Sequence, residues 1–160
     1  MKVKVLSIKE PFASLIVDGI KDVENRTRQT NYRGVILIHA SKLSTTEKRQ
    51  CKTADLLTPD QIEAIINSGL SNYYFGQMWQ SGAIIGICTL KDCTMFEKSI
   101  WADPQCYQLV MENPEWFDNP ITGCKGQLGL WEIDTDKVPD KNVRDQIINY
   151  IKAYEEKEKA

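Results

Sequence analysis

Runs of apolar residues, continuous in some places and alternating in others, predict five strands along the chain. These segments are rich in β-branched and apolar residues, as is typical of strands. Two of them, 35–40 and 82–95, carry apolar residues at successive positions, which indicates strands that are buried on both faces. The five predicted strands cover residues 3–8, 22–26, 35–40, 82–95 and 127–133.

Helical spacing of apolar residues and local end signals predict the helices. A short helix is expected to begin at Pro11, which suits a first helical position, and to end before Gly19, a typical left-handed C-cap. The segments 44–47 and 58–61 each fit a capping box, so each predicts the start of a further helix. The last helix is expected from about Asp140, with apolar residues along one face.

A further short helix is expected to begin at Asp103 and to run to about residue 111, before Pro114 breaks it. The resulting order, β-α-β-β-α-α-β-α-β-α, is not the regular alternation of a doubly wound parallel sheet. The second and third strands are too close in the sequence for a parallel crossover between them. We therefore expect an α+β fold, in which a mixed or antiparallel sheet curls into a small barrel decorated by helices.

Length and composition are those of a globular chain. It has 160 residues, of which 42% are hydrophobic and 26% charged, and it shows no repeat or flexible linker. We expect one domain over residues 1–160, in which residues 140–160 form a C-terminal helix and a charged tail. No apolar run approaches the ~20 residues of a membrane-spanning helix, and no signal peptide is evident. A cytoplasmic protein without a membrane partner is expected.

The chain holds five cysteines and one histidine. They form no C-x-x-C pair and no cluster at the short spacing of zinc ligands, so no metal site is predicted. An odd number of cysteines also argues against a disulfide framework. Reduced thiols that pack as small hydrophobic groups are the expectation.

Charge is distributed unevenly, although the formal net charge is only −2. Residues 1–52 contain 11 Lys or Arg and 5 Asp or Glu, whereas residues 53–160 contain 9 and 17. A basic segment joined to an acidic remainder permits a small cleft for a short single strand, a nucleotide or a nucleoside. It argues against a long duplex-binding surface, which needs many phosphate contacts. The alternative is that these lysines only solvate exposed strand faces.

Residues 19–26 concentrate charge in the pattern G-x-K-x-x-E-x-R. Glu24 and Arg26 are two apart on a predicted strand and therefore share one face, and Lys21 follows the helix-ending glycine. If that face points into a barrel, the guanidinium could hold a phosphate or carboxylate through two hydrogen bonds. Glu24 could accept hydrogen bonds from an exocyclic amine or move a proton. The alternative is an exposed ion pair worth at most about 1 kcal/mol.

The chain resembles the ASCH domain family, of the PUA-like superfamily, over a dense and ordered series of residues. The series is LSIKEPFASLIVDGIKDVENR at 6–26 and YRGVILIHASK at 32–42, and a looser match continues through 82–93 and 126–133. The resemblance implies a small PUA-like β-barrel, a fold shared with RNA-binding modules. It also implies a cleft beside the barrel that is lined by the G-x-K-x-x-E-x-R residues.

The resemblance places six ligand-binding candidates around that cleft: Lys21, Glu24, Arg26, His39, Ser41 and Lys42. Family members are regarded as RNA-binding or RNA-processing proteins. Some are ribonucleases, and one branch deacetylates N4-acetylcytidine. That branch places a threonine three residues after its lysine, where this chain has Glu24, so only Lys21 carries over from it.

Other residues have simpler explanations. His39 ends an apolar run, where a histidine is more often a hydrogen-bonded core residue than a catalytic base. Trp101 and Trp116 lie in a Pro-rich stretch and are the tryptophans expected to be exposed. The loop 122–127 is a weak candidate for phosphate binding, since its glycines also fit a tight turn. Cys124 has a lysine neighbour and is a weak candidate for a lowered thiol pKa.

Three functions are compatible with the sequence. The leading hypothesis is a module that binds RNA or a nucleoside or nucleotide, in which Lys21 and Arg26 hold anionic or carbonyl oxygens and Glu24 contacts amino groups. The second is a metal-independent hydrolase, either a ribonuclease or an amidohydrolase of acylated nucleosides. In it Lys21 would act as base, Arg26 would stabilise developing negative charge, and Glu24 would be a second catalytic group. The third is a protein-interaction adaptor that uses the acidic C-terminal helix. The sequence does not decide whether the protein is an enzyme, and it indicates no cofactor.

Overall fold

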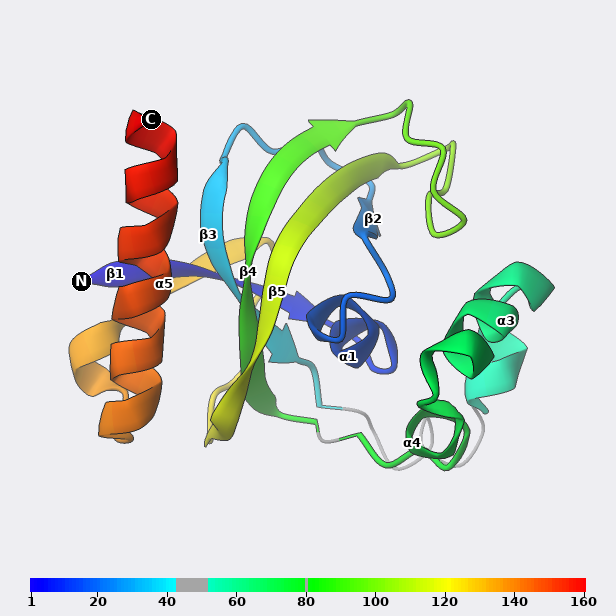
Figure 1. Ribbon diagram of the computed structural model, residues 1–160, viewed down its shortest axis with the longest axis horizontal. Helices are drawn as coiled ribbons and strands as arrows, with labels where there is room; N and C mark the ends of the chain where they lie inside the picture. Colours follow the sequence, from blue (N-terminus) through cyan, green and yellow to red (C-terminus); the bar gives the residue numbers. More distant parts are fainter. Residues whose placement is uncertain (43–51, 80) are drawn as a thin grey trace.

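Six strands form one mixed sheet, and helices pack on both of its faces (Figure 1). The structure is a computed structural model that describes residues 1–42, 52–79 and 81–160. The strand order is β2-β5-β4-β3-β1-β6, so β2 and β6 lie at the two ends of the sheet. The strands are β1 (Lys2–Ile8), β2 (Val23–Arg26), β3 (Gly34–Ala40), β4 (Ala83–Thr94), β5 (Tyr107–Thr122) and β6 (Leu130–Asp134).

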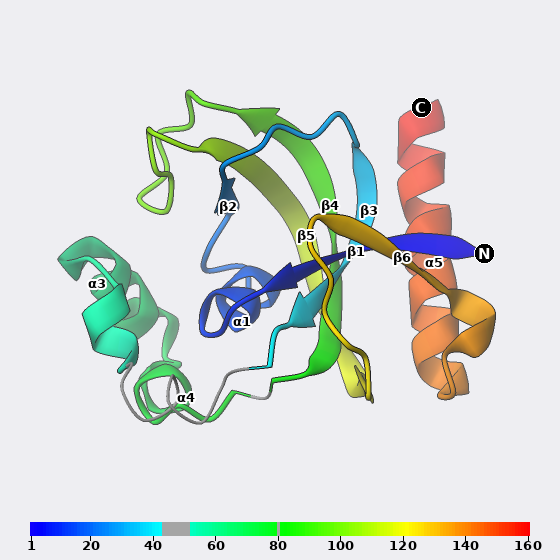
Figure 2. The same ribbon diagram turned by 180° about the vertical axis from the view of Figure 1, so that it is seen from behind.

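The sheet is strongly curled but not closed. β1 and β3 are parallel, and every other neighbouring pair is antiparallel. Because the sheet curls, β2 lies opposite the C-terminal end of β1 (Figure 2). Among the described residues, no ladder joins β2 to β6. The expected α+β class with a mixed sheet is therefore confirmed, whereas the closed barrel is not.

Three of the predicted helix starts are present, and the first helix begins directly after Pro11 and ends before Gly19. At 58–61, Thr58 accepts a hydrogen bond from the Gln61 N–H and donates its own N–H to the Gln61 side chain. Asp140 accepts from two backbone N–H groups at the start of the last helix. The capping box at 44–47 lies outside the described residues. The helical elements are α1 (Phe12–Val17), α3 (Pro59–Ser68), α4 (Ser71–Phe75), α5 (Lys141–Lys159) and the 3-10 turns η1 (Thr53–Leu56) and η2 (Thr135–Lys137).

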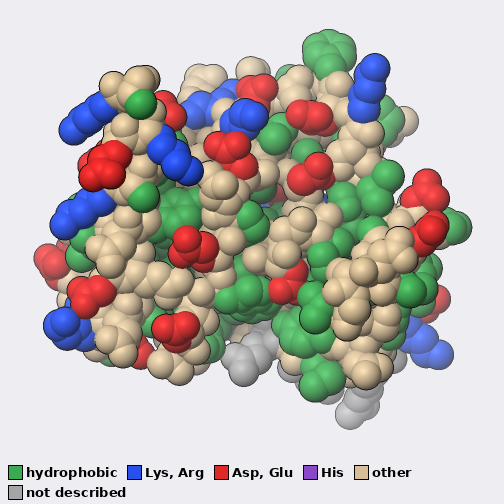
Figure 3. Space-filling model, viewed as in Figure 1, with side chains coloured by type: hydrophobic (Ala, Val, Ile, Leu, Met, Phe, Trp, Pro, Cys, Tyr) green, Lys and Arg blue, Asp and Glu red, His purple; other side chains and the backbone are tan. Residues whose placement is uncertain are grey.

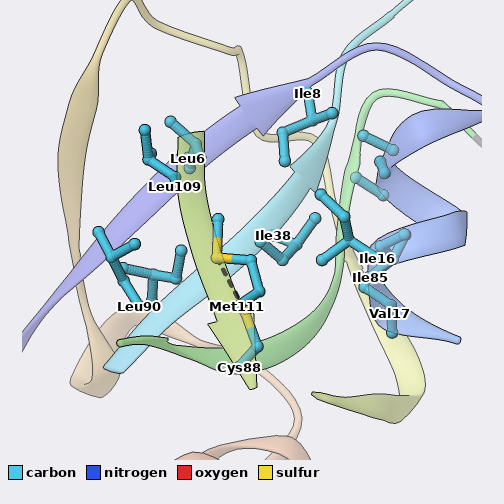
Figure 4. Close-up of a cluster of buried hydrophobic side chains, with 14 residues drawn as sticks. Leu6, Ile8, Ile16, Val17, Ile38, Ile85, Cys88, Leu90, Leu109 and Met111 are labelled. Carbon is cyan, nitrogen blue, oxygen red and sulfur yellow. Dashed lines mark hydrogen bonds between the residues drawn. The ribbon is translucent and has the colours of Figure 1, made fainter. Parts of the chain in front are cut away.

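Two large apolar clusters lie on opposite faces of the sheet. Ile36 and Ile38 of β3 pack with α1, whereas Val35 and Leu37 pack with α5. This alternation explains the continuous apolar run of β3, because both of its faces are buried. Figure 4 shows the cluster beneath α1. A third, smaller cluster joins α3 and α4 to α1 and β2. No helix in the described part of the chain has the length and apolar character needed to cross a membrane.

The helix expected from residue 103 to about 111 is wrong, because β5 occupies most of this segment. Leu109 and Met111 both pack in the cluster beneath α1, as residues two apart on a strand do. The register between β4 and β5 shifts beside Asn113, whose φ is +52°. Pro114 therefore lies in a bulge, where the missing N–H of proline costs the strand no ladder hydrogen bond.

Candidate functional site

A cleft of about 790 Å³ opens beside the end of β1. Its walls come from the start of α1, the segment through Lys21 and β2, the residues after β3 and the loop before β6. Five of the six ligand-binding candidates from the sequence line it, and these are Lys21, Glu24, Arg26, Ser41 and Lys42. Their roles remain predictions, but the structure places them around one hollow.

The end of α1 determines where Lys21 lies. Gly19 follows the helix with a φ of +77°, and the N–H of Lys21 donates to the carbonyl of Leu15 at 3.0 Å. The chain therefore turns sharply out of α1, and Lys21 reaches the cleft just before β2 begins. Glu24 and Arg26 then line the same cleft, as their spacing on a strand predicts.

Glu24 lies between two cations. Its Oε1 accepts a hydrogen bond from Lys21 Nζ at 3.1 Å, and its Oε2 accepts one from Arg26 Nη2 at 2.9 Å. Only 4% of Lys21 and 9% of Glu24 is exposed. Buried charges require partners, and here each carboxylate oxygen has one. The three head groups therefore converge, which rules out the simple exposed ion pair that the sequence left open.

Lys21 has two further neighbours that fix its ammonium group. Its Nζ donates to the carbonyl of Val23 and lies 5.5 Å from the centre of the Phe12 ring. A cation over an aromatic face is attracted to it, most strongly where water is excluded. The ammonium is thus held in place by a carboxylate, a carbonyl and an aromatic ring.

Arg26 connects β2, at one end of the curled sheet, to β1, which lies next to the strand at the other end. Besides its bond to Glu24, Nη2 donates to the carbonyl of Ser7 in β1 at 2.8 Å. Its Nε is buried and has no hydrogen-bond partner within residues 1–42, 52–79 and 81–160. Because 31% of the side chain is exposed, Arg26 is both a tie between β2 and β1 and a part of the cleft wall.

His39 lies beneath the cleft rather than on its rim, with 1% of the residue exposed. Its Nε2 is 3.0 Å from the carbonyl of Cys124, and a carbonyl only accepts, so Nε2 carries the proton. Its Nδ1 therefore accepts from the Ser7 hydroxyl at 3.1 Å, and Ser7 Oγ in turn accepts from the indole N–H of Trp131. Burial lowers the pKa of His39, which favours the neutral ring. His39 is therefore a hydrogen-bonded core residue that supports Ser7.

The loop before β6 forms one side of the cleft because it packs on this histidine. A Cβ on Gly126 would lie 3.0 Å from His39 Cε1 and 3.1 Å from Ser7 Oγ, so a larger residue would require these neighbours to shift by a few tenths of an ångström. The next residues, Gln127 and Leu128, line the cleft, and 99% of Leu128 is exposed. Gly126 and Gln127, at the end of the glycine-rich segment 122–127, thus line the cleft.

Two minor expectations are wrong. Burial raises the pKa of the Cys124 thiol, whereas its lysine neighbour suggested a lowered value. Trp101 is only 4% exposed and packs in the cluster with α3 and α4, whereas Trp116 is 37% exposed. A Pro-rich stretch suggested exposure for both tryptophans, but the packing of distant helices decides their burial.

Sequence reasoning did not select several residues that line the cleft, among them Lys9, Phe12 and Leu128. Lys9 and Phe12 lie within the stretch that resembles the ASCH family, so their closeness to the motif was an available signal. Nothing in the sequence around Leu128 indicated a role in the cleft, because its loop is brought to the G-x-K-x-x-E-x-R segment by the curl of the sheet.

The cleft is positive, although the whole chain is negative. Its described lining contains four cationic side chains and one carboxylate, for a formal charge of +3. A separate groove of about 730 Å³ between α5 and β5 has five carboxylates and one lysine in its lining, and acidic side chains are spread over this face (Figure 3). The charge separation along the sequence is therefore also a separation between two surfaces.

A comparison with protein-family models matches residues 6–122 to the ASCH domain. The match covers more than half of the chain and runs from β1 through β5. It includes the entire G-x-K-x-x-E-x-R segment and both rim residues after β3. On this evidence, the chain belongs to the ASCH domain family.

Proposed function

We propose that the cleft binds RNA, or a nucleoside or nucleotide derived from RNA. The observation that carries the proposal is the convergence of Lys21, Glu24 and Arg26 in a cleft of formal charge +3. Lys21 and Arg26 hold anionic or carbonyl oxygens of the ligand. Ser41 and Lys42 add a hydroxyl group and a second cation at the rim. Membership of the ASCH family supports the same class of ligand.

Glu24 then has a positioning role. Both of its oxygens already accept hydrogen bonds from the two cations, so it orients them toward the ligand. This differs from contact with amino groups, which the motif alone suggested.

The hydrolase alternative has less support from the geometry. A general base needs a free lone pair near the substrate. Lys21 Nζ donates to Glu24 and to the carbonyl of Val23, and Glu24 has a cation at each oxygen. Incubation with RNA and with acylated cytidines, followed by chromatography, separates the two functions, because only a hydrolase forms product.

The proposal includes a PUA-like arrangement and a cytoplasmic setting. A curled sheet that holds α1 on its inner face is consistent with the PUA-like barrels that the family resemblance implies. Four described cysteines, at 88, 93, 106 and 124, are free thiols. Free thiols are typical of proteins in reducing compartments.

Binding to short RNA, measured by fluorescence anisotropy across a salt titration, tests the proposal. Arg26→Ala and Lys42→Ala are each expected to weaken binding by about tenfold, because each removes a cation from the cleft. Lys141→Ala is the matched control, since it removes an equal charge from an α5 side chain that is 78% exposed. Unchanged affinity in both cleft variants would contradict the assignment.

A further inference from the structure

A second hollow of about 520 Å³ adjoins the cleft. It lies where the sheet fails to close, between the residues after β2 on one side and β1 with the start of β6 on the other. Its apolar lining includes Leu6 and Leu109, which are 2% and 3% exposed. Arg28, Gln29 and Thr30 contribute polar groups to it. An apolar surface with a polar border suits a flat, partly polar group such as a nucleobase.

The hollow and the cleft are continuous. Arg26, Thr27 and Leu128 line both of them. Arg26 is therefore at the junction, with 31% of its side chain exposed there, and Leu128 is a fully accessible apolar side chain beside it. A ligand can extend from one hollow into the other without crossing a wall of backbone.

The two hollows also share one sign of charge. The described lining of the second hollow contains Arg26 and Arg28 and no carboxylate. With the cleft, the described lining of the continuous surface has five cationic side chains and one anion, Glu24. Alternating apolar surface and positive charge matches a single strand, in which bases alternate with phosphates.

We propose that the cleft and the adjoining hollow form one groove for a single-stranded oligonucleotide of at least two nucleotides. One nucleotide lies in the cleft, the base of its neighbour lies in the hollow above Leu6 and Leu109, and the phosphate between them passes Arg26. A duplex does not fit, because its bases are stacked and paired and cannot enter separate hollows. This inference rests on the proposed function and narrows its ligand from a nucleoside to a strand.

A length series tests the groove. Unlabelled mononucleotides, dinucleotides and tetranucleotides of each base compete against a labelled RNA oligomer for the full-length protein. The dinucleotide is expected to bind about tenfold more tightly than the mononucleotide, since a second base gains a binding surface. A hairpin duplex without single-stranded ends is expected to compete at least about tenfold less well than a tetranucleotide.

A variant of the hollow sharpens the result. Arg28→Ala is expected to weaken dinucleotide binding by at least about threefold more than it weakens mononucleotide binding. Lys91→Ala, an exposed charge outside both hollows, is the control and changes neither. Equal affinity for one and two nucleotides, with no effect of Arg28→Ala, overturns the groove but leaves the proposed function intact. No competition by ligands of any length, together with no binding of the labelled RNA, overturns both.

Discussion

The carboxylate of Glu24 is the one anion between the buried cations of the cleft, so its removal should affect stability as well as binding. Glu24→Gln leaves Lys21 and Arg26 close together without the charge that compensates them. Loss of one partner from a buried ion pair costs roughly 3 kcal/mol in the free energy of unfolding. Denaturant unfolding monitored by circular dichroism measures this loss.

An exposed pair on the same sheet provides the control. Lys4 and Glu132 are 2.7 Å apart, and their side chains are 34% and 43% exposed. Glu132→Gln is therefore expected to lower the free energy of unfolding far less than Glu24→Gln does, because solvent screens the exposed pair. Equal effects of Glu24→Gln and Glu132→Gln would show that the cleft network is as solvated as the surface pair.

A second buried carboxylate lies at the start of α1. Glu10 is 4% exposed and accepts hydrogen bonds from the N–H and hydroxyl groups of Ser14. Burial raises the pKa of Glu10 from 4.5 to about 7, and the nearby charge of Asp18 acts in the same direction. The folded protein therefore retains this proton over a pH range in which the unfolded chain has lost it.

This difference makes stability depend on pH with a defined sign. Between about pH 4.5 and pH 7 the folded state binds the Glu10 proton more strongly than the unfolded state, so the stability that it contributes is lost as pH rises. The loss amounts to about 3 kcal/mol. Glu10→Gln mimics the protonated form, and its stability relative to the unaltered protein should rise by that amount from pH 4.5 to pH 8. A constant difference across urea titrations in this range would contradict the assignment.

The residues of the cleft could be predicted where they lie close together in the sequence. Lys21, Glu24 and Arg26 lie within six residues, so the turn after α1 and the alternation of β2 bring them together. His39 could not be placed in the same way, because its position beneath Ser7 depends on Trp131 and Cys124, which are distant in the sequence.

At the scale of elements, the contact between α1 and β4 is close enough to exclude a side chain. A Cβ on Gly86 of β4 would lie 2.5 Å from the carbonyl of Glu115 in β5 and 2.6 Å from a methyl group of Val17 in α1. Gly86→Ala is therefore expected to lower the free energy of unfolding by about 2 kcal/mol, since overpacking forces the helix away from the sheet. Thermal unfolding with an unchanged midpoint would show that α1 moves freely.

Elements with end signals were predictable, and elements shaped by irregular pairing were not. Thr58 and Asp140 cap the helices that their sequences predict, because a cap is made within four residues. The sequence predicts a helix where β5 begins, because Asp103 resembles a helix start and Pro114 a helix end. The bulge that accommodates Pro114 within a strand depends on the register between β5 and β4, which the local sequence does not specify. The closure expected of the sheet likewise depends on contacts between its two ends.

For the whole molecule, the important feature is the separation of positive and negative surfaces. The acidic groove between α5 and β5 repels a nucleic acid, whereas the cleft attracts it. Replacing Glu115, Asp118 and Asp145 by their amides is expected to raise the association rate of RNA about two- to threefold at low salt and to leave the dissociation rate unchanged. Stopped-flow measurements check this, and the difference should vanish at about 0.5 M salt. An altered dissociation rate would place RNA in direct contact with this groove.

The tie between Arg26 and the carbonyl of Ser7 couples ligand capture to the width of the opening in the sheet. A strand that draws the guanidinium toward its phosphate competes with this hydrogen bond from β2 to β1, and so loosens the opening through which it enters. Amide exchange in β1 and β2 would then report occupancy of the cleft. A single side chain, Arg26, would then both hold two strands of the sheet together and bind the ligand.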